Sequence, residues 1–198
     1  MKTQRSFCLI FPFLLISAAL HAQIGSPTCQ ITAVPAIVRA EGVAEKLGDI
    51  LINCTGTPGR EIVGNLGLTI NTTVTNRILG NGSLDVGLAV NGGQANAAAT
   101  LSGNGQITFP GLKFTFTPAG TAELRISNLR GDASFGGALI PPPIFPGGGL
   151  AFPGQPIVAQ ISFNSGLLNF TNTNFTIGSP QRSLLATTLT GNVPSQFG

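Results

Sequence analysis

Four carboxylates are the side chains of this chain whose types and spacing could support chemistry. Glu41, Glu45 and Asp49 follow one another at intervals of four residues, and Glu123 lies much farther along. An interval of four places side chains on one face of a helix. Two carboxylates that flank one glycosidic bond can hydrolyse it. These acids are therefore the candidates for a carbohydrate-active or sugar-binding site.

The residues around the first three acids weaken this interpretation. Gly42 and Gly48 disfavour a helix, and Arg39 and Lys46 offset the acidic charge. Tryptophan and tyrosine, whose rings are the usual platforms for sugars, are absent from the sequence. The alternative is a solvated surface patch of mixed charge, and the sequence favours it.

The remaining residue types exclude most other catalytic and metal centres. The one histidine is His21, so cleavage after Ala22 would leave none for a Ser-His-Asp site or a zinc site. The sequence contains no calcium-binding loop, P-loop, G-x-G-x-x-G or G-x-S-x-G motif. We therefore expect no catalytic residues, no metal ligands, no cofactor-binding residues and no cofactors.

The first 22 residues predict a secretory signal peptide. Lys2 and Arg5 provide the positive start, and an apolar run from Phe7 to Leu20 follows. At about 14 residues this run is shorter than the roughly 20 that a membrane span needs. We expect an exported chain, secreted or at the cell surface, with no stable membrane span.

Cleavage fits after Ala19 or after Ala22, and residues 23–198 are expected to form a single secreted β-domain. Of the ten basic residues, two lie in the signal peptide, so eight remain against seven acidic ones, a net charge of +1. Such a balance gives no long-range attraction to nucleic acid or to an anionic membrane. The partner stays open, with cell-envelope or extracellular matrix components as the expected class.

Cys29 and Cys54 remain after export and predict one disulfide. It would close a loop of about 25 residues, worth roughly 3–4 kcal/mol. If the two cysteines lie opposite each other in a hairpin, the turn centres between Glu41 and Gly42. The sequence of residues 46–49 is unfavourable for a strand. A longer loop with a diagonal or cross-sheet disulfide is therefore an equal alternative to the hairpin.

Short apolar segments separated by turn residues predict an all-β fold. The clearest strands are 112–117 and 122–129, where apolar and polar residues alternate, and we expect these two to be neighbours. About a dozen segments at a spacing of roughly 8–12 residues favour an antiparallel β-sandwich, Ig-like or similar, over a barrel or solenoid. Other expected strands are 29–34, 37–40, 49–54, 61–72, 73–79, 84–90, 157–163, 167–171, 174–177 and 184–190. Residues 141–156, rich in proline and glycine, are expected to form a long exposed loop.

One stretch resembles a known signature. The run 38–42 reads V-R-A-E-G, and 48–58 reads G-D-I-L-I-N-C-T-G-T-P. This resembles a group of uncharacterised secreted bacterial proteins of acidobacterial type, whose N-terminal domain typically opens with R-A-E-G and G-D-I-x-L-x-C-T-G-G-T-P. Ile52 replaces the leucine, and one glycine is missing after Cys54. Residues 75–79 and 124–130 resemble later parts of the pattern.

The likeness covers residues 28–135 and implies a secreted β-rich surface domain, without implying an activity. Relatives often continue into further extracellular modules, so the chain reads as a short member or as a truncated reading frame. Together these observations favour a secreted, non-enzymatic β-sandwich domain with a structural, adhesive or cell-surface role. The alternative is a carbohydrate-binding or carbohydrate-active extracellular domain, which two carboxylates facing each other in one concave pocket would support. A third hypothesis is an assembly subunit that donates or accepts an edge strand.

Overall fold

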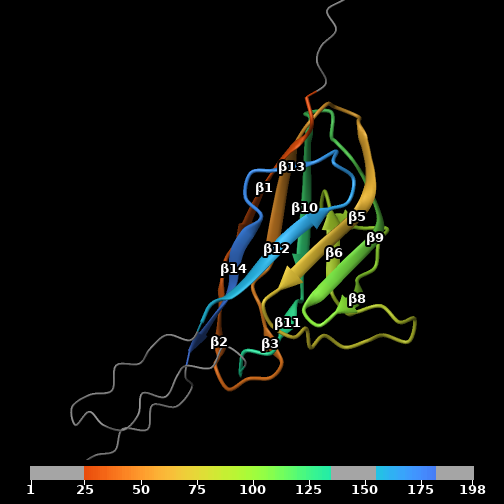
Figure 1. Cartoon of the computed structure of the whole chain (residues 1–198). Coiled ribbons are helices and arrows are strands. Elements are labelled where there is room, and N and C mark those ends of the chain that lie inside the picture. The colour runs from red at the N-terminus through yellow and green to blue at the C-terminus, as the bar shows by residue number, and fades with distance from the viewer. Residues whose placement is uncertain (1–24, 135–154, 182–198) are drawn as a thin grey trace, which may run out of the picture.

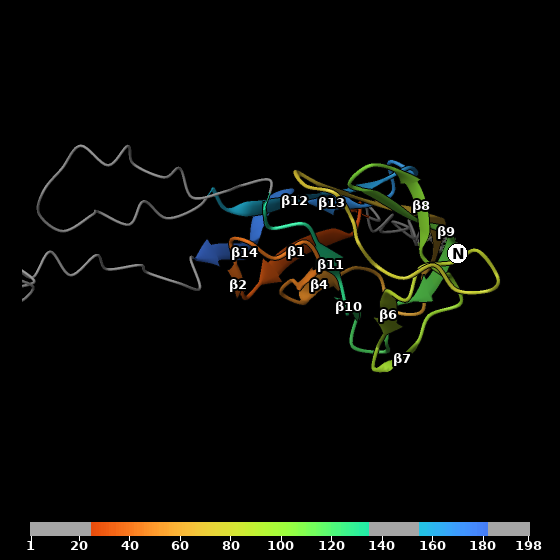
Figure 2. The same ribbon diagram turned by 90° about the horizontal axis from the view of Figure 1, so that it is seen from below.

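The computed structural model describes residues 25–134 and 155–181, which form two β-sheets packed face to face (Figure 1). Sheet A has the strand order β13-β1-β4-β10-β6-β7, and sheet B has the order β2-β14-β12-β5-β9-β8. β3 and β11 form a separate two-stranded ladder. Seen from below, β12 lies in one layer and β4 and β10 in the other (Figure 2). The strands are β1 (Thr28–Ala33), β2 (Ala36–Arg39), β3 (Glu45–Lys46), β4 (Ile50–Thr55), β5 (Glu61–Ile70), β6 (Gly87–Val90), β7 (Gly93–Gln94), β8 (Thr100–Gly103), β9 (Gln106–Thr115), β10 (Thr121–Ser127), β11 (Arg130–Gly131), β12 (Ile157–Phe163), β13 (Asn169–Phe170) and β14 (Asn174–Gln181).

This architecture confirms the predicted all-β sandwich, but the sheets are mixed instead of strictly antiparallel. β1 pairs in parallel with β13, and β14 pairs in parallel with β2. Both parallel pairs lie at the edge of a sheet and join segments that are far apart in the sequence. Parallel neighbours need a long crossover connection, so local turn signals do not reveal them.

The core lies between the sheets because inward and outward side chains alternate along the strands. In β4, Ile50, Ile52 and Cys54 are buried, whereas Asn53 and Thr55 are exposed. Burying one large apolar side chain contributes about 1.5–3 kcal/mol. The largest fully buried side chains are Phe109, Phe116, Leu47, Ile50, Ile52, Ile62, Leu66, Leu68, Ile107, Leu112, Leu124 and Ile126.

Two predictions about strand placement are wrong. β9 and β10 contain the two clearest predicted strands, but they lie in different sheets and do not pair. The turn between them changes sheets at Gly120, where φ is 74° and a Cβ would meet the Gly56 carbonyl oxygen at 2.6 Å. Residues 73–79, predicted as a strand, make only isolated bridges from Val74 and Ile78. The backbone there bonds to scattered residues instead of one neighbouring strand: the Thr75 N–H donates to the Arg130 carbonyl and the Leu79 N–H to the Ser83 carbonyl.

The predicted disulfide joins Cys29 of β1 to Cys54 of β4, and the two are direct register partners. The connection between them is longer than a hairpin. It leaves sheet A, passes through β2 in sheet B and through β3, and returns as β4. Residues 41–48, where one helical turn was an alternative, form a turn and the short strand β3. The two cysteines are therefore direct partners, as in a hairpin, although the connection between their strands is long.

Some predictions fall outside the described residues. These are the signal peptide at 1–22, all but the last two residues of the loop at 141–156, and the strand at 184–190. Within the part of the chain that the structure describes, no helix is long and apolar enough to cross a membrane.

Asparagine side chains extend the backbone ladders at several strand edges. The Asn172 Nδ2 donates to the Ile31 carbonyl at 2.8 Å, and its Oδ1 accepts from the Ile31 N–H at 3.0 Å. Asn71 makes the same paired contact with β12, donating to the Pro156 carbonyl and accepting from the Val158 N–H. A carboxamide carries a donor and an acceptor, as a peptide group does. These side chains therefore pair with strand backbone in place of further strand residues.

We expect Asn172→Asp to lower the free energy of unfolding by about 1–2 kcal/mol. The carboxylate keeps the acceptor for the Ile31 N–H but loses the donor to the Ile31 carbonyl, and it brings two acceptors together. Urea unfolding at neutral pH measures the difference. Asn174→Asp is the matched control, because Asn174 is exposed on β14 and its side chain has no hydrogen-bond partner among the described residues. Equal losses of stability in the two variants would show that the pairing of the Asn172 carboxamide with the Ile31 backbone does not stabilise the fold.

Candidate functional site

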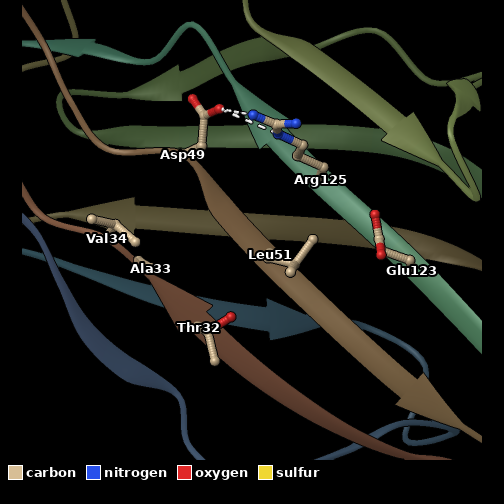
Figure 3. Close-up of a pocket in the computed structure, with 7 residues that line it drawn as sticks. All are labelled: Thr32, Ala33, Val34, Asp49, Leu51, Glu123 and Arg125. Carbon is tan, nitrogen blue, oxygen red and sulfur yellow. Dashed lines mark hydrogen bonds and ion pairs between the residues drawn. The ribbon is translucent and has the colours of Figure 1, made fainter.

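A hollow on the outer face of sheet A brings together two of the four predicted acids. Glu123 and Arg125 point outward from β10, two residues apart. Arg125 is the register partner of Leu51 in β4, and Asp49 directly precedes that strand. The hollow has a volume of about 540 Å³ (Figure 3). It is lined by Thr32, Ala33, Val34, Asp49, Leu51, Glu123 and Arg125.

An ion pair lies at one end of the hollow. The Arg125 Nη2 and Nε donate to the Asp49 Oδ2 at 2.6 and 3.2 Å. Both side chains are partly exposed, 59% for Arg125 and 32% for Asp49, so the pair contributes at most about 1 kcal/mol to stability. Its main effect is to hold the guanidinium against Asp49. The Asp49 Oδ1 and both carboxylate oxygens of Glu123 have no hydrogen-bond partner within the described ranges.

The strand register shows how far apart Asp49 and Glu123 lie. Glu123 is the partner of Asn53, which follows Asp49 by four residues. At about 3.3 Å per residue, the two positions are about 13 Å apart along the strand direction. This is a separation of backbone positions, from which the two side chains extend. Arg125 lies between the two acids (Figure 3). A polar ligand that contacts both carboxylates would therefore also pass the guanidinium.

Glu41 and Glu45 lie outside this hollow. The Glu45 Oε1 accepts from the Arg39 Nη2 and Nε at 2.7 and 2.8 Å. Glu41 lines a smaller depression of about 240 Å³ with Arg39, Gly42 and Val43. The interval of four residues therefore does not place the three acids on one helix face, because this segment is a turn and a strand. The mixed-charge patch, the sequence-based alternative, describes Glu41 and Glu45 correctly.

Metal binding has no support in residues 25–134 and 155–181. No group of three or more histidine, cysteine, aspartate or glutamate side chains there could hold a metal ion. Cys29 and Cys54 are joined in the disulfide.

Sequence reasoning missed Arg125, Leu51 and Thr32 as parts of the hollow. The outward direction of Arg125 could be predicted, because it shares the alternation of Glu123. Its pairing with Asp49 could not, because 76 residues separate the two and only the pairing of β10 with β4 joins them.

Comparisons with known proteins add little. No protein-family model matches the chain, and no curated protein matches its sequence. Among solved structures, the crystal structure of BslA, a bacterial hydrophobin, is similar over 80% of this chain and 88% of that one, with 12% identity and a TM-score of 0.28. AvmM, which catalyses macrocyclization in alchivemycin A biosynthesis, is similar over 81% and 93%, with 11% identity and a TM-score of 0.27. Likenesses this weak carry no argument about function, which must come from the residues themselves.

Proposed function

We propose that this protein is a secreted, non-enzymatic β-sandwich domain with a structural or adhesive role at the cell surface. The observation that carries the proposal is the distribution of its acids. Asp49 is held by Arg125, its backbone lies about 13 Å along the sheet from that of Glu123, and the hollow that these two acids line does not include Glu41 or Glu45. We take this distribution as support for binding without hydrolysis, which uses two carboxylates that flank one bond.

Two observations support export. The positive start and apolar run of residues 1–22 are typical of a signal peptide. The Cys29–Cys54 disulfide suits an oxidising compartment, where such bonds persist. The resemblance of residues 38–58 to secreted surface proteins of acidobacterial type favours the same location, and membership of that group is part of the proposal. The partners we propose are cell-envelope or extracellular matrix components.

The proposal predicts binding without turnover. The purified mature chain is expected to be retained by a cell-envelope fraction and to release no reducing sugar from envelope polysaccharides. The variant Asp49→Asn/Glu123→Gln is the control, because it removes both acids of the hollow, which are on the surface, with little effect on folding. Release of sugar by the wild type that disappears in this variant would refute the non-enzymatic role. Failure to bind any envelope or matrix fraction would refute the adhesive role.

The second candidate is carbohydrate binding at the hollow. Two carboxylates, one guanidinium and the Thr32 hydroxyl surround the side chain of Leu51. A volume of about 540 Å³ lies within the range of about 300–1,000 Å³ typical of small-ligand sites. A few convergent polar groups around an apolar floor are also typical of such sites. This candidate differs from the first in predicting a soluble oligosaccharide ligand.

A further inference from the structure

We infer that the hollow on sheet A selects a glycan whose sugars carry a protonated amine. This inference rests on the second candidate function, carbohydrate binding at the same hollow. It follows from the Glu123 carboxylate, whose oxygens have no hydrogen-bond partner among the described residues, together with the shape and charge of the lining.

The Glu123 end of the hollow presents acceptors. At the other end, the Arg125 Nε and Nη2 donate to the Asp49 Oδ2, and the Arg125 Nη1, which has no acceptor among the described residues, stays free to donate. The Asp49 Oδ1 and the two oxygens of Glu123 have no partner in the described part of the chain, and a carboxylate can only accept. A ligand group that lies against Glu123 must therefore supply donors. A protonated amine supplies three, and a ligand carboxylate or sulfate supplies none.

The charge of the lining favours the same ligand. Asp49, Glu123 and Arg125 are the ionisable residues of the hollow, and together they carry a net charge of −1. The guanidinium that would repel a cation is turned toward Asp49. The Glu123 carboxylate, in contrast, has no cationic partner among the described residues. Opposite charge at close range favours an amine there, whereas an acidic polysaccharide would be repelled.

The apolar part of the lining indicates a sugar ring instead of a slender cation. Leu51 lies half-buried at the floor, and Ala33 and Val34 follow it on the β1 side. Val34 is 82% exposed. The C–H face of a pyranose can cover these groups, whereas a lysine side chain would leave much of this surface wet. The hollow is also wide enough for more than one sugar, because its two acids lie about 13 Å apart along the strand.

Amide side chains extend the polar surface beyond the hollow. Asn53 is the register partner of both Glu123 and Gln30, so these three exposed residues form a row across β10, β4 and β1. Amides both donate and accept, as sugar hydroxyls do. Neighbouring sugars of the same chain can therefore bind the row while an amine binds Glu123.

Calorimetric titration of the mature chain with two tetrasaccharides tests this inference. The glucosamine tetramer, with its amines protonated, is expected to bind at least about tenfold more tightly than the N-acetylated tetramer. Glu123→Gln is expected to remove this preference. Glu61→Gln is the matched control, because it makes the same charge change at an exposed position of sheet B, where Glu61 pairs with Lys113. It is expected to leave the preference unchanged.

Three outcomes would overturn the inference in distinguishable ways. Equal affinity for both tetramers, reduced alike by Glu123→Gln, would keep carbohydrate binding at the hollow but refute selection of an amine. Binding of neither tetramer would refute the inference but not binding of other oligosaccharides at the hollow, whereas retention by the cell envelope tests the first candidate separately. Displacement of the glucosamine tetramer by a short lysine peptide of equal charge, with equal affinity, would show that the hollow recognises amines without recognising sugars.

Discussion

Replacing Cys54 with serine is expected to lower the free energy of unfolding by about 3–4 kcal/mol and the melting temperature by about 10 °C. The disulfide spans a sequence separation of 25 residues, and it limits the freedom of this loop in the unfolded chain. Cys29 and Cys54 are also buried, at 0% and 2% exposure, so a serine hydroxyl and an unpaired thiol would replace the bridge inside the core.

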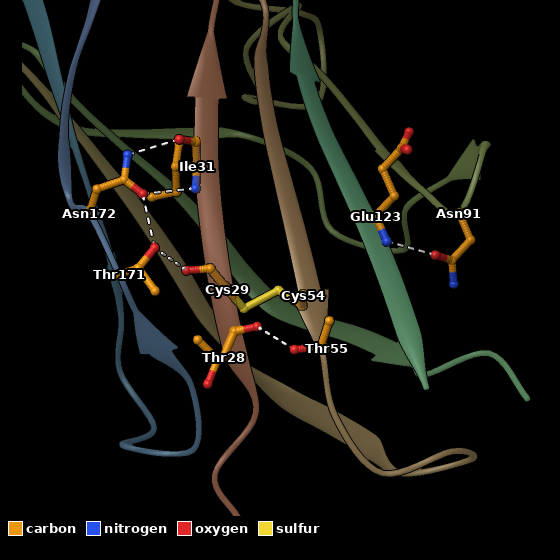
Figure 4. Close-up of a disulfide and its surroundings, with 9 residues drawn as sticks. All are labelled: Thr28, Cys29, Ile31, Cys54, Thr55, Asn91, Glu123, Thr171 and Asn172. Carbon is orange, nitrogen blue, oxygen red and sulfur yellow. Dashed lines mark hydrogen bonds between the residues drawn. A yellow bond between two sulfur atoms is a disulfide. The ribbon is translucent and has the colours of Figure 1, made fainter. Parts of the chain in front are cut away.

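The position of the disulfide adds to the expected effect. The bond joins the neighbouring strands β1 and β4 of sheet A, and the connection that it closes contains β2, which belongs to sheet B (Figure 4). On its other side, β1 contacts the two-residue strand β13, Thr171 and the Asn172 side chain, which together form a shorter edge than β4 does (Figure 4). Reduction would therefore weaken the attachment of β1 to sheet A.

Scanning calorimetry of the oxidised wild type and of the Cys29→Ser/Cys54→Ser double variant measures this loss without leaving a free thiol. Glu45→Ala is the control, because it removes only the ion pair with Arg39, whose own side chain is 70% exposed. Such pairs contribute about 0–1 kcal/mol. Equal melting temperatures for the wild type and the double variant would refute the stabilising role of the bridge.

Features that depend on neighbouring residues in the chain could be predicted from the sequence. β12 begins at Ile157 and ends at Phe163, the bounds that alternation predicts. β1 and β4 differ from the predicted 29–34 and 49–54 by one residue at each end. Period-two alternation directly reflects the burial of one face of a strand, so it identifies a strand without knowledge of its partners.

Features that depend on distant residues could not be predicted. The alternation in β9 and β10 does not say which sheet each strand joins, because both sheets bury one face in the same core. The hollow needs the pairing of β10 with β4 to bring Arg125 to Asp49. The interval of four between Glu45 and Asp49 suggested a helix face, but the two glycines and the exit into β4 favoured a turn and strand.

Asparagine side chains make backbone contacts that could not be predicted from the sequence. Their carboxamides pair with backbone at Ile31, in β12 and around Arg130, so the ladders there continue without strand residues. No pattern of hydrophobicity marks such a contact. The predicted strand at 73–79 is wrong because its backbone bonds to scattered residues, such as Arg130 and Ser83, and forms no continuous ladder with one strand. Asn76 turns inward there and is only 8% exposed.

Asn76 is the centre of a buried polar network. Its Nδ2 donates to the Asp85 Oδ1 at 2.9 Å and to the Asn128 carbonyl at 2.7 Å, while its Oδ1 accepts from the Arg130 N–H at 2.7 Å. The Asn128 Nδ2 in turn donates to the Asp85 carbonyl at 2.6 Å. Every polar atom of the carboxamide is used, and burial makes each lost contact costly.

Asn76→Asp is therefore expected to lower the free energy of unfolding by about 4 kcal/mol at neutral pH. The carboxylate still accepts from the Arg130 N–H, but its second oxygen faces the Asp85 carboxylate and the Asn128 carbonyl with no proton to donate. A buried negative charge then lies against a like charge, which is worse than the simple loss of contacts in Asn76→Ala, expected to cost about 2 kcal/mol.

The pH dependence separates this explanation from a simple packing defect. The introduced carboxyl is more easily protonated in the folded chain than in the unfolded chain, because a proton removes the repulsion and restores a donor. The loss in free energy of unfolding of Asn76→Asp relative to wild type should therefore be smaller at about pH 4 than at neutral pH, whereas the loss of Asn76→Ala should be the same at both.

Asn81→Asp is the matched control. The Asn81 Oδ1 only accepts, from the Ser83 N–H and Oγ, so a carboxylate can replace it with little loss of stability. Urea unfolding of the wild type and the three variants, at about pH 4 and at neutral pH, measures these losses. A loss of stability in Asn76→Asp that is independent of pH would rule out charge repulsion as its cause.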